Sequence, residues 1–329
     1  MPAEVAAGKT YLDAISAALR DEMRRDPGVF LLGEDIGLLG GAFRVTKGFL
    51  DEFGPDRVMD MPLGEAGIVG TAIGAALRGL RPVVEMQFAD FVVCAFNQLV
   101  TYASLNHWRT GTRLPLVVWL PYGGGVGAGP FHSRCPEAWF RHVPGLKIVA
   151  PATPADAYGL LVGAIRDDNP VLFLEHKALY RKLRGDVPPS GSVVPLGQAR
   201  IARPGRDVTV VTYGATVHVA LEAAETLADD GVETEIIDLR SLAPLDDEAI
   251  LASVRRTRRL VIAHEDALTG GIGADIAALV AERAFESLAA PVRRVAALDV
   301  PIGAAPSLEA ATLPAGESIQ QAIRGMIRS

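Results

Sequence analysis

The stretch DMPLGEAGIVGTAIGAALRGLRPVVEM, residues 60–86, joins a helix signal to a strand signal. Glu65 opens a run of small and apolar residues, and a glutamate in a first helical turn faces the helix dipole favourably. The apolar run Pro82–Met86 follows and is typical of a strand that is buried on both faces. A helix that leads into a buried strand is the repeating unit of an α/β fold.

Further apolar runs lie on both sides of this stretch. Because they are nearly continuous rather than alternating, they predict strands of parallel sheets with helices on both faces. Helical segments separate them, one beginning after Thr153 as a credible N-cap and another ending at Gly231. The additional strand runs are Val29–Gly33, Pro115–Leu120, Leu146–Ala150, Val171–Glu175, Val208–Tyr213, Thr234–Leu239 and Arg259–Glu265.

The length of 329 residues favours two domains over one. The α/β pattern breaks once, between Arg181 and Asp207, where prolines and glycines interrupt both helix and central strand. We therefore predict two doubly wound α/β domains, residues 1–185 and 207–329, joined by a linker at 186–206.

Charge and cysteine content narrow the class of protein. A net charge of −7 without a block of Lys and Arg argues against nucleic acid or an anionic membrane as partner. The two cysteines, Cys94 and Cys135, do not make a disulfide framework and fit a reducing compartment. The sequence carries no signal-peptide or transit pattern and no apolar run of ~18 residues, so we expect a cytoplasmic protein.

Glu65 has two interpretations. It is either an ordinary helix start or a carboxyl in a poorly solvated site that exchanges a proton with a bound ligand. The helix that it opens carries Gly67, Gly70 and Gly74 on about one face, and each interior glycine costs about 1 kcal/mol relative to alanine. This spacing predicts close approach of another backbone, within the fold or across a subunit boundary.

His132 follows a glycine-rich loop after the predicted strand Pro115–Leu120. Most single histidines are satisfied, partly buried residues, but loops at the carboxyl ends of parallel strands form the crevice of open α/β sheets. His132 is therefore a candidate proton donor or carboxylate partner. Cys135 and His142 lie close by in the sequence but lack a fourth well-spaced ligand for zinc.

Gln87 and Phe91 follow the strand Pro82–Met86 and have a similar double interpretation. A phenylalanine at helical spacing is usually a core residue, but an amide and a ring at a strand end can also clasp a flat heterocycle. The glycine clusters lack both the Lys-Ser/Thr ending of a P-loop and the dinucleotide fingerprint. Asp167 and Asn169 look like a turn before a strand, although oxygens gathered there can also hold a cation.

Taken together, these segments resemble the beta subunit of the thiamine-diphosphate-dependent 2-oxo acid dehydrogenases, the decarboxylating components of the pyruvate, branched-chain 2-oxo acid and acetoin dehydrogenase complexes. The resemblance spans nearly the whole chain and implies a pyrimidine-binding domain followed by a transketolase C-terminal-like domain. The matching stretches are LGEDIG with GGAFRVTKGF, FGPDRVMDMPLGEAGIVGTAIGAALRGLRPVVEMQFADF, GPFHSRCPEAWFRHVPGLKIVAP, AIRDDNPVLFLEHKALYR and, near the C-terminus, DVTVVTYGATV with VETEIIDLRSLAPLD.

The resemblance also implies roles for single residues. Glu65 matches the cofactor-activating glutamate that hydrogen-bonds the aminopyrimidine nitrogen of thiamine diphosphate. Phe91 matches the aromatic residue that stacks on the pyrimidine, with Gln87 beside it. His132 matches the histidine that serves substrate binding and acyl transfer to lipoyl. A structural potassium site is implied as well, held mostly by backbone oxygens of Leu116, Ala164, Ile165, Asp167 and Asn169.

The absence of one motif from the sequence indicates that a second kind of subunit is needed. Thiamine-diphosphate enzymes of this type hold magnesium and the diphosphate with a Gly-Asp-Gly motif, which this sequence lacks. The resemblance therefore implies an alpha2beta2 heterotetramer in which a separate alpha subunit holds most of the Mg²⁺ site. A lipoyl-bearing dihydrolipoyl acyltransferase core is the implied further partner. Two alternatives stay open, a subunit of a split transketolase-like enzyme and an inactive scaffold subunit.

Overall fold

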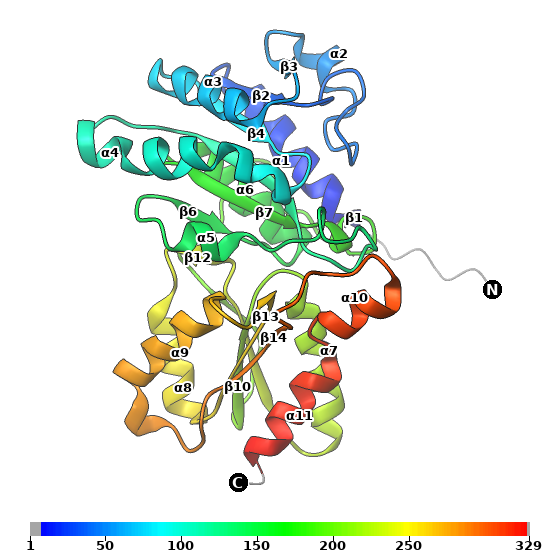
Figure 1. The fold of residues 1–329 in the computed structure, drawn as a ribbon, viewed down its shortest axis with the longest axis vertical. Coiled ribbons are helices and arrows are strands. Elements are labelled where there is room, and N and C mark those ends of the chain that lie inside the picture. The colour runs from blue at the N-terminus through cyan, green and yellow to red at the C-terminus, as the bar shows by residue number, and fades with distance from the viewer. Residues whose placement is uncertain (1–7, 328–329) are drawn as a thin grey trace, which may run out of the picture. The chain divides into compact units, whose positions relative to one another are not determined.

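The computed structural model describes residues 8–327, which form two compact units (Figure 1). One unit comprises the described residues up to Tyr122 together with Trp139–Leu196. The other comprises Gly123–Ala138 and the described residues from Gly197 onward. The segment Gly123–Ala138, which contains His132, thus groups with the C-terminal part of the chain rather than with the strands that flank it in sequence.

The first unit is built on a parallel sheet with the strand order β6-β7-β5-β4-β2-β3. A short antiparallel pair, β1 (Lys9–Thr10) with β8 (Arg184–Gly185), lies in the same unit. The strands of the parallel sheet are β2 (Val29–Gly33), β3 (Val58–Asp60), β4 (Arg81–Glu85), β5 (Val117–Tyr122), β6 (Lys147–Val149) and β7 (Val171–His176).

Helices cover this sheet. α1 and α6 pack against each other, whereas α3 packs against β4 and the 3-10 helix η1. A capping box begins α1, because the Thr10 side chain accepts from the Asp13 N–H at 3.1 Å and the Thr10 N–H donates to the Asp13 carboxylate at 3.0 Å. The helices are α1 (Tyr11–Arg25), α2 (Phe49–Phe53), α3 (Glu65–Leu77), η1 (Ala89–Ala95), the π-helix η2 (Gln98–Ala103), α4 (Ser104–Thr110), α6 (Pro154–Arg166) and η3 (Lys177–Leu179), with α5 (Glu137–Arg141) at the boundary of the two units in sequence.

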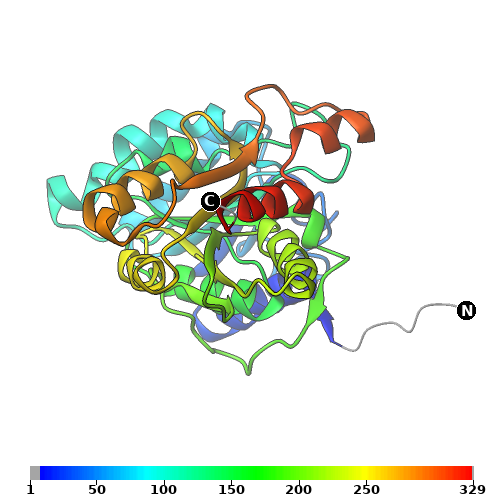
Figure 2. The same ribbon diagram turned by 90° about the horizontal axis from the view of Figure 1, so that it is seen from below.

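The second unit has its own sheet in the order β14-β13-β10-β11-β9, parallel except for the antiparallel edge strand β9. Helices α8 and α9 lie on one side of this sheet, and α7 and α11 lie on the other (Figure 2). Its strands and helices are β9 (Arg200–Arg203), β10 (Val208–Thr212), α7 (Thr216–Asp229), β11 (Thr234–Asp238), β12 (Ser241–Ala243), α8 (Asp247–Thr257), β13 (Leu260–Ala267), α9 (Ile272–Arg283), η4 (Phe285–Ser287), β14 (Arg293–Ala297), α10 (Pro306–Thr312) and α11 (Gly316–Ile327).

The structure confirms the predicted α/β fold. Each apolar run that predicts a strand coincides with one, and β2 begins and ends at the predicted residues, Val29 and Gly33. The strands β1, β3, β8, β9, β12 and β14 were not predicted. Strand β9 lies inside the segment predicted as a linker, 186–206, where it adds an edge to the second sheet. No helix among residues 8–327 is long and apolar enough to cross a membrane.

Candidate functional site

Glu65 is the first residue of α3 and is half-buried. The preceding Gly64 donates its backbone N–H to the carboxylate of Glu34 at 3.3 Å, which brings a second acid to the head of this helix. Desolvation raises the pKa of Glu34, and the negative charges of Glu65 and Asp35 raise it further, while the bond from Gly64 opposes them. A buried carboxyl and a half-buried one therefore lie close together at the head of α3.

The helix η1 lies beside Glu65 and carries Cys94 and Phe91. Desolvation, the charge of Glu65 and a hydrogen bond to its carboxylate together raise the pKa of the Cys94 thiol. Phe91 is half-buried and meets Phe88 edge to face, with ring centroids 5.8 Å apart. Gln87, also half-buried, lies between β4 and η1. The first unit thus brings Glu65 alongside the short helix that carries the predicted aromatic residue.

Two buried acids lie on β4 and β7, the two strands that flank β5 in the sheet. Glu85 ends β4 and Glu175 lies near the end of β7, and both side chains are almost completely buried. Burial raises the pKa of Glu85 to about 8, with the charge of Glu175 adding to the effect, and burial raises the pKa of Glu175 to about 8. Tyr180 donates its hydroxyl to Glu175. Neither carboxylate oxygen of Glu85 has a hydrogen-bond partner among residues 8–327.

Sequence reasoning missed this pair because each acid stands at the end of an apolar run. The signal that could have found them is the same in both, a single carboxylate in the last positions of a strand that is buried on both faces. A buried carboxylate without a partner is costly unless it is protonated, so Glu85 is expected to be neutral at pH 7.

Three glycines of α3 face outward in this chain. A Cβ built at Gly67, Gly70 or Gly74 would meet no other atom of the described residues within 4 Å. Of the two explanations for these glycines, close packing within the described chain is therefore wrong. Approach of another subunit stays a prediction.

His132 lies in the second unit, whereas Glu65, Gln87 and Phe91 lie in the first. The loop that precedes it is closed at its base by a hydrogen bond of 3.2 Å from the Gly123 N–H to the Arg134 carbonyl. His132 itself is half-buried and donates its backbone N–H to the Gly129 carbonyl at 3.3 Å. Two acids that were not predicted to lie here, Glu265 and Glu309, accept hydrogen bonds from backbone N–H groups of the same loop.

A second buried acid cluster accompanies this loop. Glu137 is fully buried and accepts a hydrogen bond of 2.6 Å from the Tyr213 hydroxyl. Burial and the charge of Asp266 raise the pKa of Glu137 to about 8, although the bond from Tyr213 opposes them. Burial likewise raises the pKa of Asp266 to about 6 and lowers that of His264 to about 4. His264 is therefore neutral at pH 7 and accepts from the Gly273 N–H at 3.2 Å.

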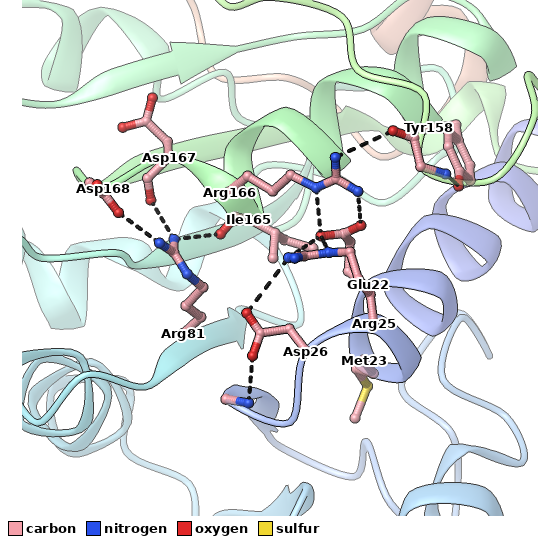
Figure 3. Close-up of polar contacts among 12 residues, drawn as sticks. Glu22, Met23, Arg25, Asp26, Arg81, Tyr158, Ile165, Arg166, Asp167 and Asp168 are labelled. Carbon is pink, nitrogen blue, oxygen red and sulfur yellow. Dashed lines mark hydrogen bonds and ion pairs between the residues drawn. The ribbon is translucent and has the colours of Figure 1, made fainter.

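Two of the residues predicted to hold potassium, Ile165 and Asp167, lie at the C-terminal end of α6 next to Arg81 (Figure 3). Arg81, at the start of β4, donates to the carbonyls of Ile165 and Asp167, both at 3.0 Å, and to the Asp168 carboxylate at 2.7 Å. Lys147 forms an ion pair with the Asp167 carboxylate at 2.5 Å. Two of the predicted carbonyl ligands thus already accept hydrogen bonds from a guanidinium.

Two of the other predicted potassium ligands, Leu116 and Ala164, also have backbone partners. The Leu116 carbonyl accepts from the Val171 N–H at 2.9 Å, and the Ala164 carbonyl accepts from the Asp167 N–H at 3.3 Å. Asn169 donates its backbone N–H to the Asp167 carboxylate at 2.9 Å. In the part of the chain that the structure describes, no cluster of three or more His, Cys, Asp or Glu side chains could hold a metal ion, and both cysteines are free thiols.

Comparison with protein families defines the class. Residues 7–182 match the model described as "Transketolase, pyrimidine binding domain", and residues 197–319 match "Transketolase, C-terminal domain". A solved structure, "Split gene transketolase, inactive beta4 tetramer", superposes with a TM-score of 0.79 over 98% of this chain and 99% of that one. Its sequence identity of 23% supports the fold alone.

Several named proteins are more similar in sequence to this chain than that solved structure is. The chain is 46% identical to the 2-oxoisovalerate dehydrogenase subunit beta of Bacillus subtilis, covering 96% of this chain and 97% of that protein. It is 47% identical to the pyruvate dehydrogenase E1 component subunit beta of Leifsonia xyli, covering 94% and 92%. The chain belongs to the family of 2-oxo acid dehydrogenase E1 beta subunits, which confirms the resemblance seen in the sequence.

Proposed function

We propose that this chain is the beta half of an enzyme that oxidatively decarboxylates a 2-oxo acid with thiamine diphosphate and transfers the acyl group to a lipoyl domain. The observation that carries the proposal is the identity of 46–47% to E1 beta subunits over 94–96% of the chain. We further propose residues 1–185 as the pyrimidine-binding domain and 207–329 as the transketolase C-terminal-type domain, with 186–206 between them.

The surroundings of Glu65 suit an aminopyrimidine ring. When bound, thiamine diphosphate supplies the carbon nucleophile that attacks the 2-oxo group. Glu65 would hold a proton at the ring nitrogen, and its half-buried position at the head of α3 limits exchange with bulk water. Phe91 would stack on the ring, and Gln87 offers an amide at the same strand end.

His132 would bind the substrate carboxylate and assist acyl transfer to lipoyl. An imidazole is suited to both tasks, because it changes its charge near neutral pH and can either donate or accept a proton. The support for this role is the match of the segment FHSRCPEAWF to the family together with the fixed loop on which His132 lies.

The remaining half of the cofactor site would come from an alpha subunit. Without a Gly-Asp-Gly motif this chain has no family-type ligands for Mg²⁺ and the diphosphate. The outward-facing glycines of α3 suit the close approach of another subunit's helix. We infer an alpha2beta2 heterotetramer, with a lipoyl-bearing dihydrolipoyl acyltransferase core as further partner and the cytoplasm as location.

A potassium ion at the end of α6 is a separate proposal. Carbonyls of a last helical turn attract cations, but Arg81 already donates to two of them, so potassium would use their second lone pairs. If potassium binds there, the melting temperature will be higher in potassium chloride than in choline chloride at equal ionic strength. Equal melting temperatures in the two salts would exclude a stabilising potassium site.

The two alternatives, an inactive scaffold subunit and a subunit of a split transketolase-like enzyme, predict different activities for a complex reconstituted with an alpha subunit. An inactive scaffold subunit would copurify with an alpha subunit without supporting decarboxylation. A split transketolase-like subunit would support pentose transfer without acylation of lipoyl.

Substitution of Glu65 tests the proposal most sharply. Glu65→Gln should leave assembly with the alpha subunit intact and lower decarboxylation with an artificial electron acceptor by about 10² or more, the range typical of acid–base groups. The exposed Glu286→Gln variant serves as the matched control. Turnover of Glu65→Gln close to that of the control would refute the role of Glu65. A panel of pyruvate, 2-oxobutyrate, 2-oxoisovalerate and acetoin would then identify the substrate.

A further inference from the structure

Glu309 binds the glycine-rich loop Gly123–Gly129 with both carboxylate oxygens. The Gly125 N–H donates to Oε1 at 2.9 Å, and the Gly127 N–H donates to Oε2 at 3.0 Å. The Glu309 side chain is 6% exposed, so water competes little for these bonds. Hydrogen bonds to an ionised acceptor are shorter and stronger than neutral ones. One carboxylate therefore holds two points of the loop at once.

The loop conformation is suited to this contact. Gly125 and Gly127 have φ of +76° and +69°, a left-handed region that favours glycine. Successive backbone N–H groups in such a turn can converge on one anion. Here the anion is a side chain of the protein's own α10, supplied from a position far along the chain.

A second carboxylate reinforces the same loop. The Gly124 N–H donates to Glu265, which ends the buried part of β13. A Cβ at Gly124 would lie 3.0 Å from the Leu313 side chain and 3.2 Å from Glu309 Oε1, so only glycine fits without displacing these groups. The contact between the loop and α10 is thus tight as well as polar.

The loop carries this restraint to His132. Gly129 packs against Ala304, where a Cβ would lie 3.2 Å from the alanine methyl. The carbonyl of Gly129 accepts the backbone N–H of His132 at 3.3 Å. A continuous series of contacts therefore runs from Glu309 through the loop to the backbone of His132.

We propose that Glu309 is a positioning residue for His132: by binding the N–H groups of Gly125 and Gly127, it fixes the loop that places the imidazole for acyl transfer. The inference rests on the proposed function of His132. Glu309 lies on α10, outside the segment FHSRCPEAWF that contains His132.

The loop contact is tested on the full chain by hydrogen–deuterium exchange, which needs no activity. In Glu309→Gln one acceptor oxygen becomes an NH₂ group that faces an N–H donor, so one bond is lost. Peptides covering residues 123–131 should exchange at least about tenfold faster than in the wild type. The matched control is Glu317→Gln, because Glu317 is exposed and accepts a hydrogen bond from Gln321 on the same helix. Unchanged exchange in Glu309→Gln would overturn the proposal.

The catalytic effect is tested by a double-mutant cycle in the complex with the alpha subunit. Glu309→Gln should slow acylation of a lipoyl domain by about 10- to 100-fold, the size expected from misplacing a catalytic group. Added to His132→Ala, the same substitution should have almost no further effect, since Glu309 acts through His132. Full additivity of the two effects, or wild-type acylation by Glu309→Gln, would contradict the inference.

Two outcomes separate the inference from the proposed function. If wild-type complex fails to acylate lipoyl, the proposed function fails, and the exchange experiment alone then decides whether Glu309 fixes the loop. If Glu309→Gln is poorly folded, Glu309→Asp replaces it, because this variant keeps the charge but is too short by one methylene to reach both N–H groups. Faster loop exchange in Glu309→Asp supports the inference, and wild-type exchange overturns it.

Discussion

Glu85 shows how a single buried side chain links stability to pH. Its carboxyl is buried and is subject to the negative charge of the buried Glu175, and both groups have a pKa raised to about 8 from the ordinary 4.5. A carboxyl with a raised pKa in the folded state binds its proton more tightly there than in the unfolded chain. The stability that comes from the protonated Glu85 carboxyl is therefore fully present below about pH 4.5 and is lost as the pH rises towards 8.

Glu85→Gln should remove part of this dependence. Glutamine resembles the protonated acid and never ionises, so the variant and the wild type should melt at similar temperatures near pH 4.5. Above pH 8 the variant should be the more stable, by a few kcal/mol, because one pKa unit corresponds to about 1.4 kcal/mol. Calorimetric melting temperatures across this pH range provide the measurement. A difference between the two proteins that stays constant with pH would show that Glu85 does not titrate as described.

Single residues were predictable where sequence spacing carries the signal. Glu65 opens its helix as predicted, and η1 with Phe91 follows directly after β4. Glu85 and Glu309 were not predictable, because their importance depends on what surrounds them in space. An acid at the end of a strand and an acid in a short helix are both ordinary features until burial and partners are known.

In helix α6, the N-terminus could be predicted from the sequence, whereas the partner of the C-terminus could not. Its N-terminus is visible in the sequence, since the Thr153 side chain accepts from the Asp156 N–H at 3.1 Å as an N-cap should. Its C-terminal carbonyl at Ile165 instead accepts a hydrogen bond from Arg81 of β4, which lies more than eighty residues before Ile165 in the sequence. Local chemistry determines the start of α6, and tertiary contacts satisfy its end.

Thr153→Ala should destabilise the protein by about 1 kcal/mol, the usual effect of removing an N-cap. Thr153→Ser keeps the hydroxyl and is the matched control, with a melting temperature close to that of the wild type. Thermal unfolding of both variants measures the difference. Equal melting temperatures of Thr153→Ala and Thr153→Ser would mean that the cap contributes nothing to stability.

For the whole molecule, hydrophobic periodicity predicted two α/β units but not which segments belong to each. The loop Gly123–Ala138 groups with the second unit, yet it follows β5 of the first directly in sequence. Glycine-rich loops have no periodicity, and the partners of this one lie more than a hundred residues away. The edge strand β9 was missed for a related reason, since its short polar sequence, RIAR, does not read as a buried strand.

At the scale of the whole molecule, we expect the chain to supply half of a catalytic site. The most direct test is decarboxylation of 2-oxo acids with an artificial electron acceptor, in the presence of thiamine diphosphate and Mg²⁺. We expect turnover only when the purified chain is combined with its alpha subunit, and none from either chain alone. Turnover by the purified chain without an alpha subunit would contradict the shared cofactor site.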